Sequence, residues 1–307
     1  MLRRWIQFYW ERCGAHAVGL ASSAFASDLI VQRLLGNTQV VLHAEILISM
    51  ITIPLMGLAF RCSDELRDMD TDLQYFPDRP LAAGRISPRE VKALALLAVA
   101  VSLVINIIWP YAPIPLFLGT GFLALIHSWY FMPRLISGNR FLAVTANLPF
   151  LFLLYLYVGE AAAFRSGYVQ PGWIPAAVAV WMIIPLHTYE FARKVVAAGQ
   201  EREGYQTYSA MIGPRPAAWL AFSTAIVHYL LALLWPPARL LYGSWIILLG
   251  AVLLFYFGVT VFFSLGQGHC FKNKKVQLFF NEGLGGTAGI YGVCSRVFSV
   301  LSAFMWF

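Results

Sequence analysis

The chain has 307 residues, of which 59% are hydrophobic and only 12% are charged, and its mean hydropathy is +0.67. Soluble globular domains are about half apolar and a quarter charged, so this composition argues against a soluble protein and predicts a polytopic membrane protein. The net charge of +7 comes from basic residues beside apolar stretches, which indicates contact with anionic membrane lipids and no role in nucleic-acid binding.

Apolar stretches long enough to cross a bilayer recur along the whole sequence. A transmembrane helix needs about 17–25 predominantly apolar residues, and about nine stretches meet this criterion. In chain order they are centred on Ala15–Leu34, Ala44–Phe60, Val91–Trp109, Pro113–Met132, Phe141–Val158, Ile174–Phe191, Ala217–Trp235, Ser244–Leu265 and Gly286–Trp306. The sequence therefore predicts an all-α fold, a polytopic membrane bundle of about nine helices around a central cavity.

The segments between these spans are short. None is long enough to bury a hydrophobic core of its own, so residues 1–307 are expected to form a single transmembrane domain. When the spans alternate across the membrane, most of the 22 Lys and Arg residues fall on one side. Cytoplasmic loops carry an excess of Lys and Arg, which predicts a multi-pass integral membrane protein whose N-terminus is cytoplasmic, with the loops after the second and sixth spans on the same side.

The loop after the second span carries the strongest functional signal. Asp64, Asp68 and Asp72 recur at four-residue spacing, which places side chains on one face of a helix, and Glu65 falls on the side of Asp68. Carboxylates gathered in this way can share a divalent cation. Asp70 points away from this face and is expected to be solvated. A shared face requires one helix that continues through all three aspartates.

Basic residues follow these acids directly. Arg79 lies in the turn Pro77-Asp78-Arg79-Pro80, and Arg85 comes soon after it. The alternative to a binding site is an amphipathic interfacial helix whose acids only face water. Cations beside a concentrated negative face favour binding, because an arginine there can meet an anion that a metal bridges to the carboxylates. The pattern predicts phosphate chemistry at a membrane surface.

The loop after the sixth span repeats this mixture of charges. Glu190 lies at the expected cytoplasmic end of that span, where an acid within reach of the bilayer is costly unless it has a partner, and Arg193 and Lys194 follow within one helical turn. Snorkelling cations with a counter-ion would give the same pattern. A second carboxylate site facing the first would instead hold another Mg²⁺ on a diphosphate.

The first loop resembles the signature of a known family. It reads Asp64-Glu65-x-x-Asp68-x-x-x-Asp72 and then Arg79-Pro80-x-x-x-Gly84, which is similar to the Asn-Asp-x-x-Asp-x-x-x-Asp and Arg-Pro-x-x-x-Gly pattern of the UbiA superfamily of intramembrane prenyltransferases. The number of spans and the positions of the two polar loops also match the family plan, so the resemblance covers essentially the whole chain. It departs from the pattern where Asp64 replaces the usual Asn and where Glu190 with Arg193-Lys194 replaces Asp-x-x-x-Asp.

The resemblance implies an enzyme that acts on an isoprenyl diphosphate with Mg²⁺ as its cofactor. It implies that the Mg²⁺ ligands are Asp64, Glu65, Asp68, Asp72, Glu190 and Glu201. Among these, catalysis is expected to depend above all on Asp64, Asp68, Asp72 and Glu190. It also implies that the substrates are bound by Arg79, Arg85, Tyr130, Arg134, Asn147, Tyr189, Arg193 and Lys194.

Several functions stay open on the sequence alone. The first is transfer of the prenyl group to a small aromatic or lipid-like acceptor. The second is a terpene cyclase on the same scaffold, in which the allylic cation is attacked by its own double bonds. The third uses a phosphoribosyl diphosphate donor and a polyprenyl phosphate acceptor. A transporter is the non-enzymatic alternative, but its ionisable groups would be expected near the bilayer midplane, and here they gather at one face.

Overall fold

The computed structural model describes residues 1–37, 44–109, 113–127, 131–137, 139–168, 172–196, 201–234 and 243–266. Every regular element in these ranges is a helix. The chain divides into two compact units, Met1–Val180 and Trp181–Phe307.

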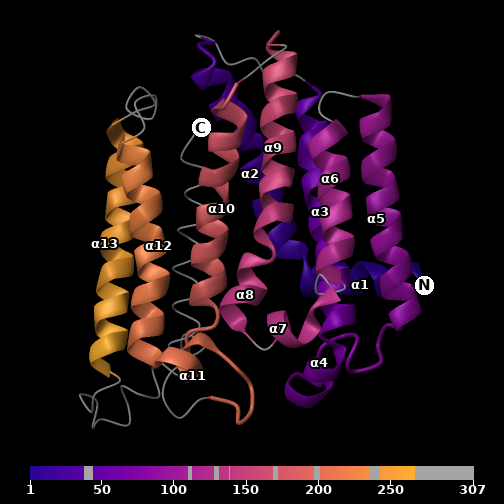
Figure 1. The fold of residues 1–307 in the computed structure, drawn as a ribbon, viewed down its shortest axis with the longest axis vertical. Coiled ribbons are helices and arrows are strands. Elements are labelled where there is room, and N and C mark those ends of the chain that lie inside the picture. Colours follow the sequence, from indigo (N-terminus) through magenta and orange to yellow (C-terminus); the bar gives the residue numbers. More distant parts are fainter. Residues whose placement is uncertain are drawn as a thin grey trace. The chain divides into compact units, whose positions relative to one another are not determined.

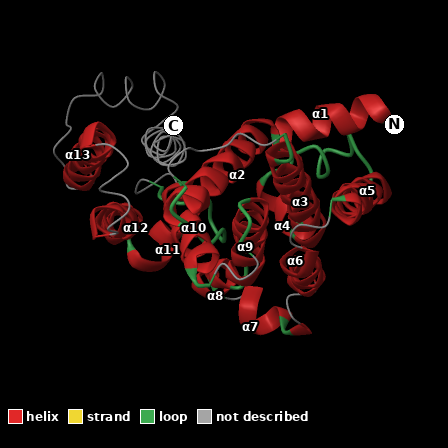
Figure 2. Cartoon of the chain, turned by 90° about the horizontal axis from the view of Figure 1, so that it is seen from above, coloured by secondary structure: helices red, strands yellow, loops and turns green. Residues whose placement is uncertain are grey.

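The first unit is a bundle of long helices with short helices at one end (Figure 1). In chain order its helices are α1 (Leu2–Arg12), α2 (Gly14–Leu34), α3 (Ile46–Arg67), α4 (Met69–Tyr75), α5 (Pro88–Ile108), α6 (Pro113–His127), α7 (Pro133–Ser137), α8 (Arg140–Thr145), α9 (Leu148–Arg165) and the first part of α10 (Ile174–Ala192). Seen end-on in Figure 2, α3 packs against α2 and α5, and α9 packs against α2 and α6. The short helices α4 and α7 lie at the lower end of this unit in Figure 1.

Helix α1 does not run along the bundle. It makes an angle of 69° with α2 and lies across the other helices in both views (Figures 1 and 2). Phe8 on its inner face is buried in the core, while Leu2, Ile6 and Trp10 on another face are exposed. A helix with one exposed apolar face that lies across a bundle has the character of an interfacial helix.

The described part of the second unit contains the rest of α10 and three further helices. These are α11 (Tyr208–Ile212), α12 (Pro214–Leu234) and α13 (Gly243–Gly266), and the last two lie side by side. The Trp181 ring stacks on His228 at a centroid distance of 5.0 Å, and the Thr188 and Thr224 hydroxyls are 2.9 Å apart. Both contacts join α10 to α12.

The predicted membrane bundle is confirmed, while its span count stays a prediction. Among the described residues, four helical segments are long and apolar enough to cross a membrane, namely Ile46–Arg67, Pro88–Ile108, Phe141–Arg165 (α8 and α9 together) and Ile174–Ala192, and a fifth is added if α1 and α2 form one bent span. The span predicted at Gly286–Trp306 lies outside the described residues. The central cavity likewise stays a prediction.

Polar side chains join the long helices inside the first unit. Tyr157 Oη donates a hydrogen bond to Asn106 Oδ1 (2.6 Å), and Asn106 Nδ2 donates to Thr52 Oγ1 (2.8 Å). All three side chains are buried, and they connect α9, α5 and α3. In a bilayer the hydrophobic effect does not drive helices together, so hydrogen bonds of this kind help to specify which helices pair.

A buried ion pair connects α2 to α9. Asp28 and Arg165 form the pair, and their side chains are only 1% and 3% exposed. Gln32 Nε2 donates a second hydrogen bond to the Asp28 carboxylate at 2.7 Å. Removing one partner of a buried pair leaves the other charge uncompensated, which costs more than the pair contributes when intact.

We therefore expect Asp28→Asn to lower the free energy of unfolding by about 3 kcal/mol, because it leaves the Arg165 guanidinium without its counter-charge. The double variant Asp28→Leu/Arg165→Leu should recover much of this loss, since it buries no charge. Thermal unfolding of the purified protein in detergent measures both. An Asp28→Asn protein as stable as the wild type would show that the pair does not hold α2 and α9 together.

Candidate active site

The acidic residues of the first loop lie on two helices and not on one. Helix α3 ends at Arg67, and α4 begins at Met69. Between them Asp68 has φ −94° and ψ 11°, outside the helical region, which is common for a residue whose side chain competes for backbone hydrogen bonds. The expectation that one unbroken helix runs through Asp64, Asp68 and Asp72 is therefore wrong, because the helix breaks at the middle aspartate.

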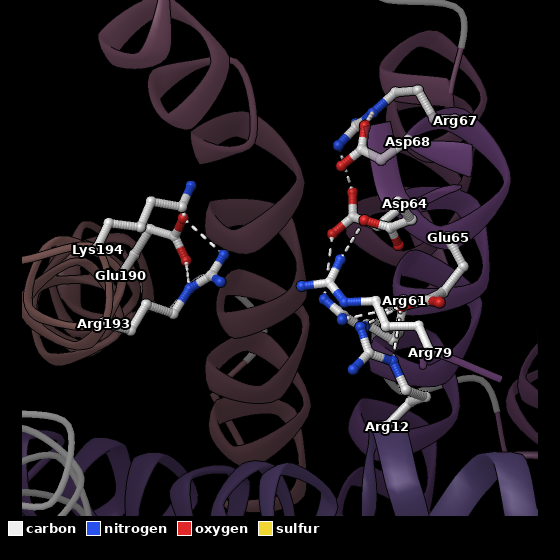
Figure 3. A network of polar contacts seen from close by, with 11 residues as sticks. Arg12, Arg61, Asp64, Glu65, Arg67, Asp68, Arg79, Glu190, Arg193 and Lys194 are labelled. Atoms are coloured by element: carbon white, nitrogen blue, oxygen red, sulfur yellow. Dashed lines mark hydrogen bonds and ion pairs between the residues drawn. The ribbon is translucent and has the colours of Figure 1, made fainter. Parts of the chain in front are cut away.

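Arginines alternate with these acids at the end of α3 (Figure 3). Arg67 Nη2 lies 2.6 Å from Asp64 Oδ1, and Arg67 Nε lies 3.1 Å from Asp68 Oδ1. One turn earlier, Arg61 Nη2 lies 2.9 Å from Glu65 Oε1 and Arg61 Nη1 lies 4.0 Å from Asp64 Oδ2. The acids and the arginines thus form one continuous cluster of opposite charges.

The turn after α4 brings Arg79 back to this cluster. The Arg79 guanidinium pairs with the Asp72 carboxylate, whose side chain is only 6% exposed, and it lies 4.0 Å from the centroid of the Phe76 ring. Asp70, in contrast, is exposed, as predicted. Arg79 is therefore fixed both by an ion pair and by an aromatic face.

The same turn depends on the glycine of the Arg-Pro-x-x-x-Gly pattern. Gly84 has φ +67°, a left-handed conformation that glycine adopts without steric cost. Its amide donates to Leu81 O (3.1 Å), and the Arg85 amide donates to Pro80 O (2.9 Å). Arg85 then reaches Glu11 on α1, with 2.6 Å between Arg85 Nη1 and Glu11 Oε1. Hydrogen bonds from Arg85 and then from Gln7 lower the pKa of Glu11.

An arginine from α1 completes the cluster. Arg12 Nε and Nη2 lie 2.7 and 2.5 Å from Glu65 Oε1, and the Glu65 side chain is only 1% exposed. Arg12, Arg61 and Arg67 are not among the site residues predicted from the sequence. Arg61 stands three and four residues from Asp64 and Glu65, and Arg67 stands three residues from Asp64, a spacing that predicts ion pairs on a helix. Arg12 lies 53 residues from Glu65, and no spacing rule connects them.

The second loop contains a cluster of paired charges, which lies within the second unit. Arg193 Nη2 donates to Glu190 Oε1 at 2.8 Å, and Lys194 Nζ lies 2.5 Å from the same oxygen; Figure 3 shows the three side chains together. Lys194 is largely buried, and its Nζ lies 5.9 Å from the centroid of the Tyr208 ring. Glu201 is engaged elsewhere, since Thr207 Oγ1 lies within 2.9 Å of its carboxylate oxygens.

The other predicted substrate residues have varied surroundings. Arg134 is exposed on α7. Asn147 precedes α9, and its Oδ1 atom is buried with no hydrogen-bond partner in the described part of the chain. Tyr189 is half-buried on α10, and Tyr130 lies outside the described residues.

Two carboxylates of the first loop have the chemistry and the exposure that a magnesium ligand needs. Mg²⁺ prefers oxygen ligands and commonly binds through one or two carboxylates plus substrate phosphates. The Asp64 and Asp68 side chains fit, because they are acidic and still 18% and 38% exposed. Among the described residues, no three acidic, histidine or cysteine side chains are already grouped as a metal site. The structure therefore offers suitable donors without a ready-made set of ligands.

Comparison with protein families identifies the family of the chain that carries this cluster. A model of the UbiA prenyltransferase family matches residues 24–281, which is most of the chain. The chain belongs to the UbiA prenyltransferase family. No curated protein and no solved structure gives a significant match. Membership in the UbiA family supports an intramembrane, prenyltransferase-type function in general terms and confirms the resemblance seen in the sequence.

The left-handed glycine gives a test of the turn. Gly84→Ala should cost about 1–2 kcal/mol of local stability, because a Cβ atom is disfavoured at positive φ, although no atom outside the turn would clash with it. Gly84→Asn should cost less, since Asn tolerates this conformation. Hydrogen exchange of residues 79–87 in each variant measures the effect. Equal exchange in the Ala variant and the wild type would mean that the turn is not held by this residue.

Proposed function

We propose that the protein is a Mg²⁺-dependent intramembrane prenyltransferase. Its donor would be an isoprenyl diphosphate, and its acceptor a small aromatic or lipid-like molecule. The observation that carries the proposal is the cluster at the end of α3, where Asp64, Asp68 and Asp72 are interleaved with arginines in a chain of the UbiA family. Such a cluster supplies carboxylates, which can bind the metal, and guanidinium groups, which can bind the diphosphate.

Arginines of the cluster would bind the phosphate groups. A guanidinium that pairs with a carboxylate presents its N–H groups in a planar fork, and the same fork fits phosphate oxygens. Arg79 suits this role because its side chain is still 25% exposed while Phe76 supports its other face. We propose the same role for Arg193 and Lys194 of the second loop, with Arg85, Arg134, Asn147, Tyr130 and Tyr189 as further contacts to the substrates.

Acids of each loop would hold Mg²⁺. In the first loop we propose Asp64, Asp68 and Asp72 as ligands, and in the second loop Glu190, with Glu201 as an additional candidate. When bound, Mg²⁺ neutralises the diphosphate and stabilises it as a leaving group. Arginine N–H groups would donate to the phosphate oxygens as the bond between the allylic carbon and oxygen breaks and negative charge grows there. The acceptor would then bond to the allylic carbon, and the proton that it loses would pass to the released diphosphate or to water.

Orientation follows from the distribution of positive charge. Arg4, Arg12, Arg61 and Arg79 all belong to the end of the first unit where α1 and α4 lie. Cytoplasmic ends of membrane proteins carry this excess. We propose that the N-terminus and both polar loops face the cytoplasm, with membrane lipids around the bundle.

Product analysis tests the proposed reaction. Purified protein is incubated with geranyl, farnesyl or geranylgeranyl diphosphate and Mg²⁺, with and without added phenols, quinone precursors or lipids, and the organic extract is analysed. A prenylated product that forms only when an acceptor is present supports transfer. Cyclic hydrocarbons or terpene alcohols released without an acceptor would replace this proposal with a terpene cyclase.

The acidic residues give a matched set of variants. We expect Asp68→Asn and Asp72→Asn each to lower the rate about a thousandfold, because each removes a charged group that acts in the transition state. Asp70→Asn is the control, since Asp70 lies in the same helix as Asp72 but is exposed. Steady-state rates with a radiolabelled diphosphate measure all three. If Asp70→Asn lowered the rate as much as the other two variants, the specific roles proposed for Asp68 and Asp72 would be contradicted.

Metal removal tests the cofactor independently. The rate should fall to background in excess EDTA and return when Mg²⁺ is restored, because the leaving diphosphate would carry uncompensated charge without the ion. Full activity in EDTA would contradict the proposed Mg²⁺ dependence.

A further inference from the structure

Glu65 has surroundings unlike those of the neighbouring aspartates. Its side chain is 1% exposed, and one oxygen, Oε1, accepts hydrogen bonds from Arg12 Nε and Nη2 and lies 2.9 Å from Arg61 Nη2. The other oxygen is buried and has no hydrogen-bond partner among the described residues. Two guanidinium groups thus already surround this buried carboxylate, so a divalent cation could reach it only beside both positive charges, which would repel it. Asp64 also contacts two arginines, but its side chain is 18% exposed and therefore open to an incoming ion.

The contacts of Arg61 extend this arrangement to an aspartate of the proposed metal site. Arg61 holds Glu65 through Nη2, and its Nη1 atom lies 4.0 Å from Asp64 Oδ2. A chain of contacts therefore runs from Arg12 through Glu65 and Arg61 to Asp64 (Figure 3). It begins at Arg12 on α1 and ends at Asp64, the residue before Glu65, near the end of α3.

Helix α1 is attached to the same region by two more ion pairs, both nearer to solvent. Arg4 Nη2 lies 2.7 Å from Glu90 Oε1, and Glu11 Oε1 lies 2.6 Å from Arg85 Nη1. Exposed pairs of this kind contribute little to stability. The contact of Arg12 with Glu65 is buried, so its loss would leave a buried charge without its full compensation.

We propose that Glu65 is a positioning residue and not a metal ligand: with Arg12 and Arg61 it forms a clamp that fixes α1 against the end of α3 and orients Asp64. The clamp makes the N-terminal helix part of the active site, although α1 itself precedes the segment that matches the family. Removing a residue that orients a metal ligand without touching the metal commonly lowers metal affinity by about 10–100-fold. Only the effect on Asp64 rests on the proposed function, because the contact between α1 and α3 stands without it.

Glu65 as a metal ligand and Glu65 as a positioning residue predict different effects of Glu65→Gln and Arg12→Gln on metal affinity. If Glu65 were a ligand, Glu65→Gln would weaken metal binding, whereas Arg12→Gln would leave it unchanged or strengthen it, because a competing cation is removed. If Glu65 positions Asp64, both variants interrupt the same chain of contacts. They should then weaken binding equally, and the double variant should be no worse than either single variant.

The test uses the full-length purified protein with Mn²⁺ as the probe and inorganic diphosphate present, and free Mn²⁺ is measured by electron paramagnetic resonance. We expect Glu65→Gln, Arg12→Gln and the double variant each to lower Mn²⁺ affinity by about tenfold. Hydrogen exchange of residues 2–12 should rise in all three. Glu11→Gln is the matched control, because it removes an exposed ion pair of the same helix, and it should change neither quantity.

Several results would overturn the clamp. They are a loss of Mn²⁺ affinity in Glu65→Gln alone, additive losses in the double variant, unchanged affinity in both single variants, or unchanged hydrogen exchange in α1. If Glu65→Gln does not fold, Arg12→Lys replaces it: this variant keeps the charge but loses one of the two guanidinium contacts, and a partial loss of affinity is expected, whereas wild-type affinity would contradict the clamp. If the protein fails to turn over any prenyl diphosphate, the exchange measurement still decides whether Arg12 and Glu65 hold α1.

Discussion

The cluster at the end of α3 depends on one constraint, which is that charge near the edge of a bilayer needs an opposite charge close by. Asp64, Glu65, Asp68 and Asp72 each contact an arginine, and the side chains of Glu65 and Asp72 are almost fully buried. Desolvation would make these acids costly if they stood alone. The arginines therefore allow a high density of carboxylates to exist at this place in the fold.

The same constraint connects structure to the proposed chemistry. A carboxylate held by an arginine is pre-positioned, and both groups have a natural partner in a metal diphosphate, since oxygen anions bind Mg²⁺ and guanidinium groups bind phosphate. Groups that are already oriented need not reorganise when charge develops on the leaving group, which is where electrostatic catalysis gains most. Asp68, the most exposed of the four acids, is the one best placed to meet an incoming ion.

Sequence patterns predicted what depends on local spacing and missed what depends on the path of the chain. Apolar stretches located α3, α5, α9 and α10, since a span needs a fixed length of apolar residues. The family pattern located the acids and Arg79. The break at Asp68 escaped prediction, because helical periodicity contains no information on a single pair of backbone dihedrals. Arg12 escaped as well, since only the 69° turn between α1 and α2 brings it to Glu65.

The central claim is that the arginine-paired acids at the end of α3 bind the metal diphosphate. Anomalous diffraction from crystals grown with Mn²⁺ and a non-hydrolysable prenyl thiodiphosphate tests it most directly. The account predicts a manganese peak beside the carboxylates of Asp64, Asp68 or Asp72, with the diphosphate in contact with Arg79. A bound diphosphate whose manganese and phosphates contact none of these residues would contradict it.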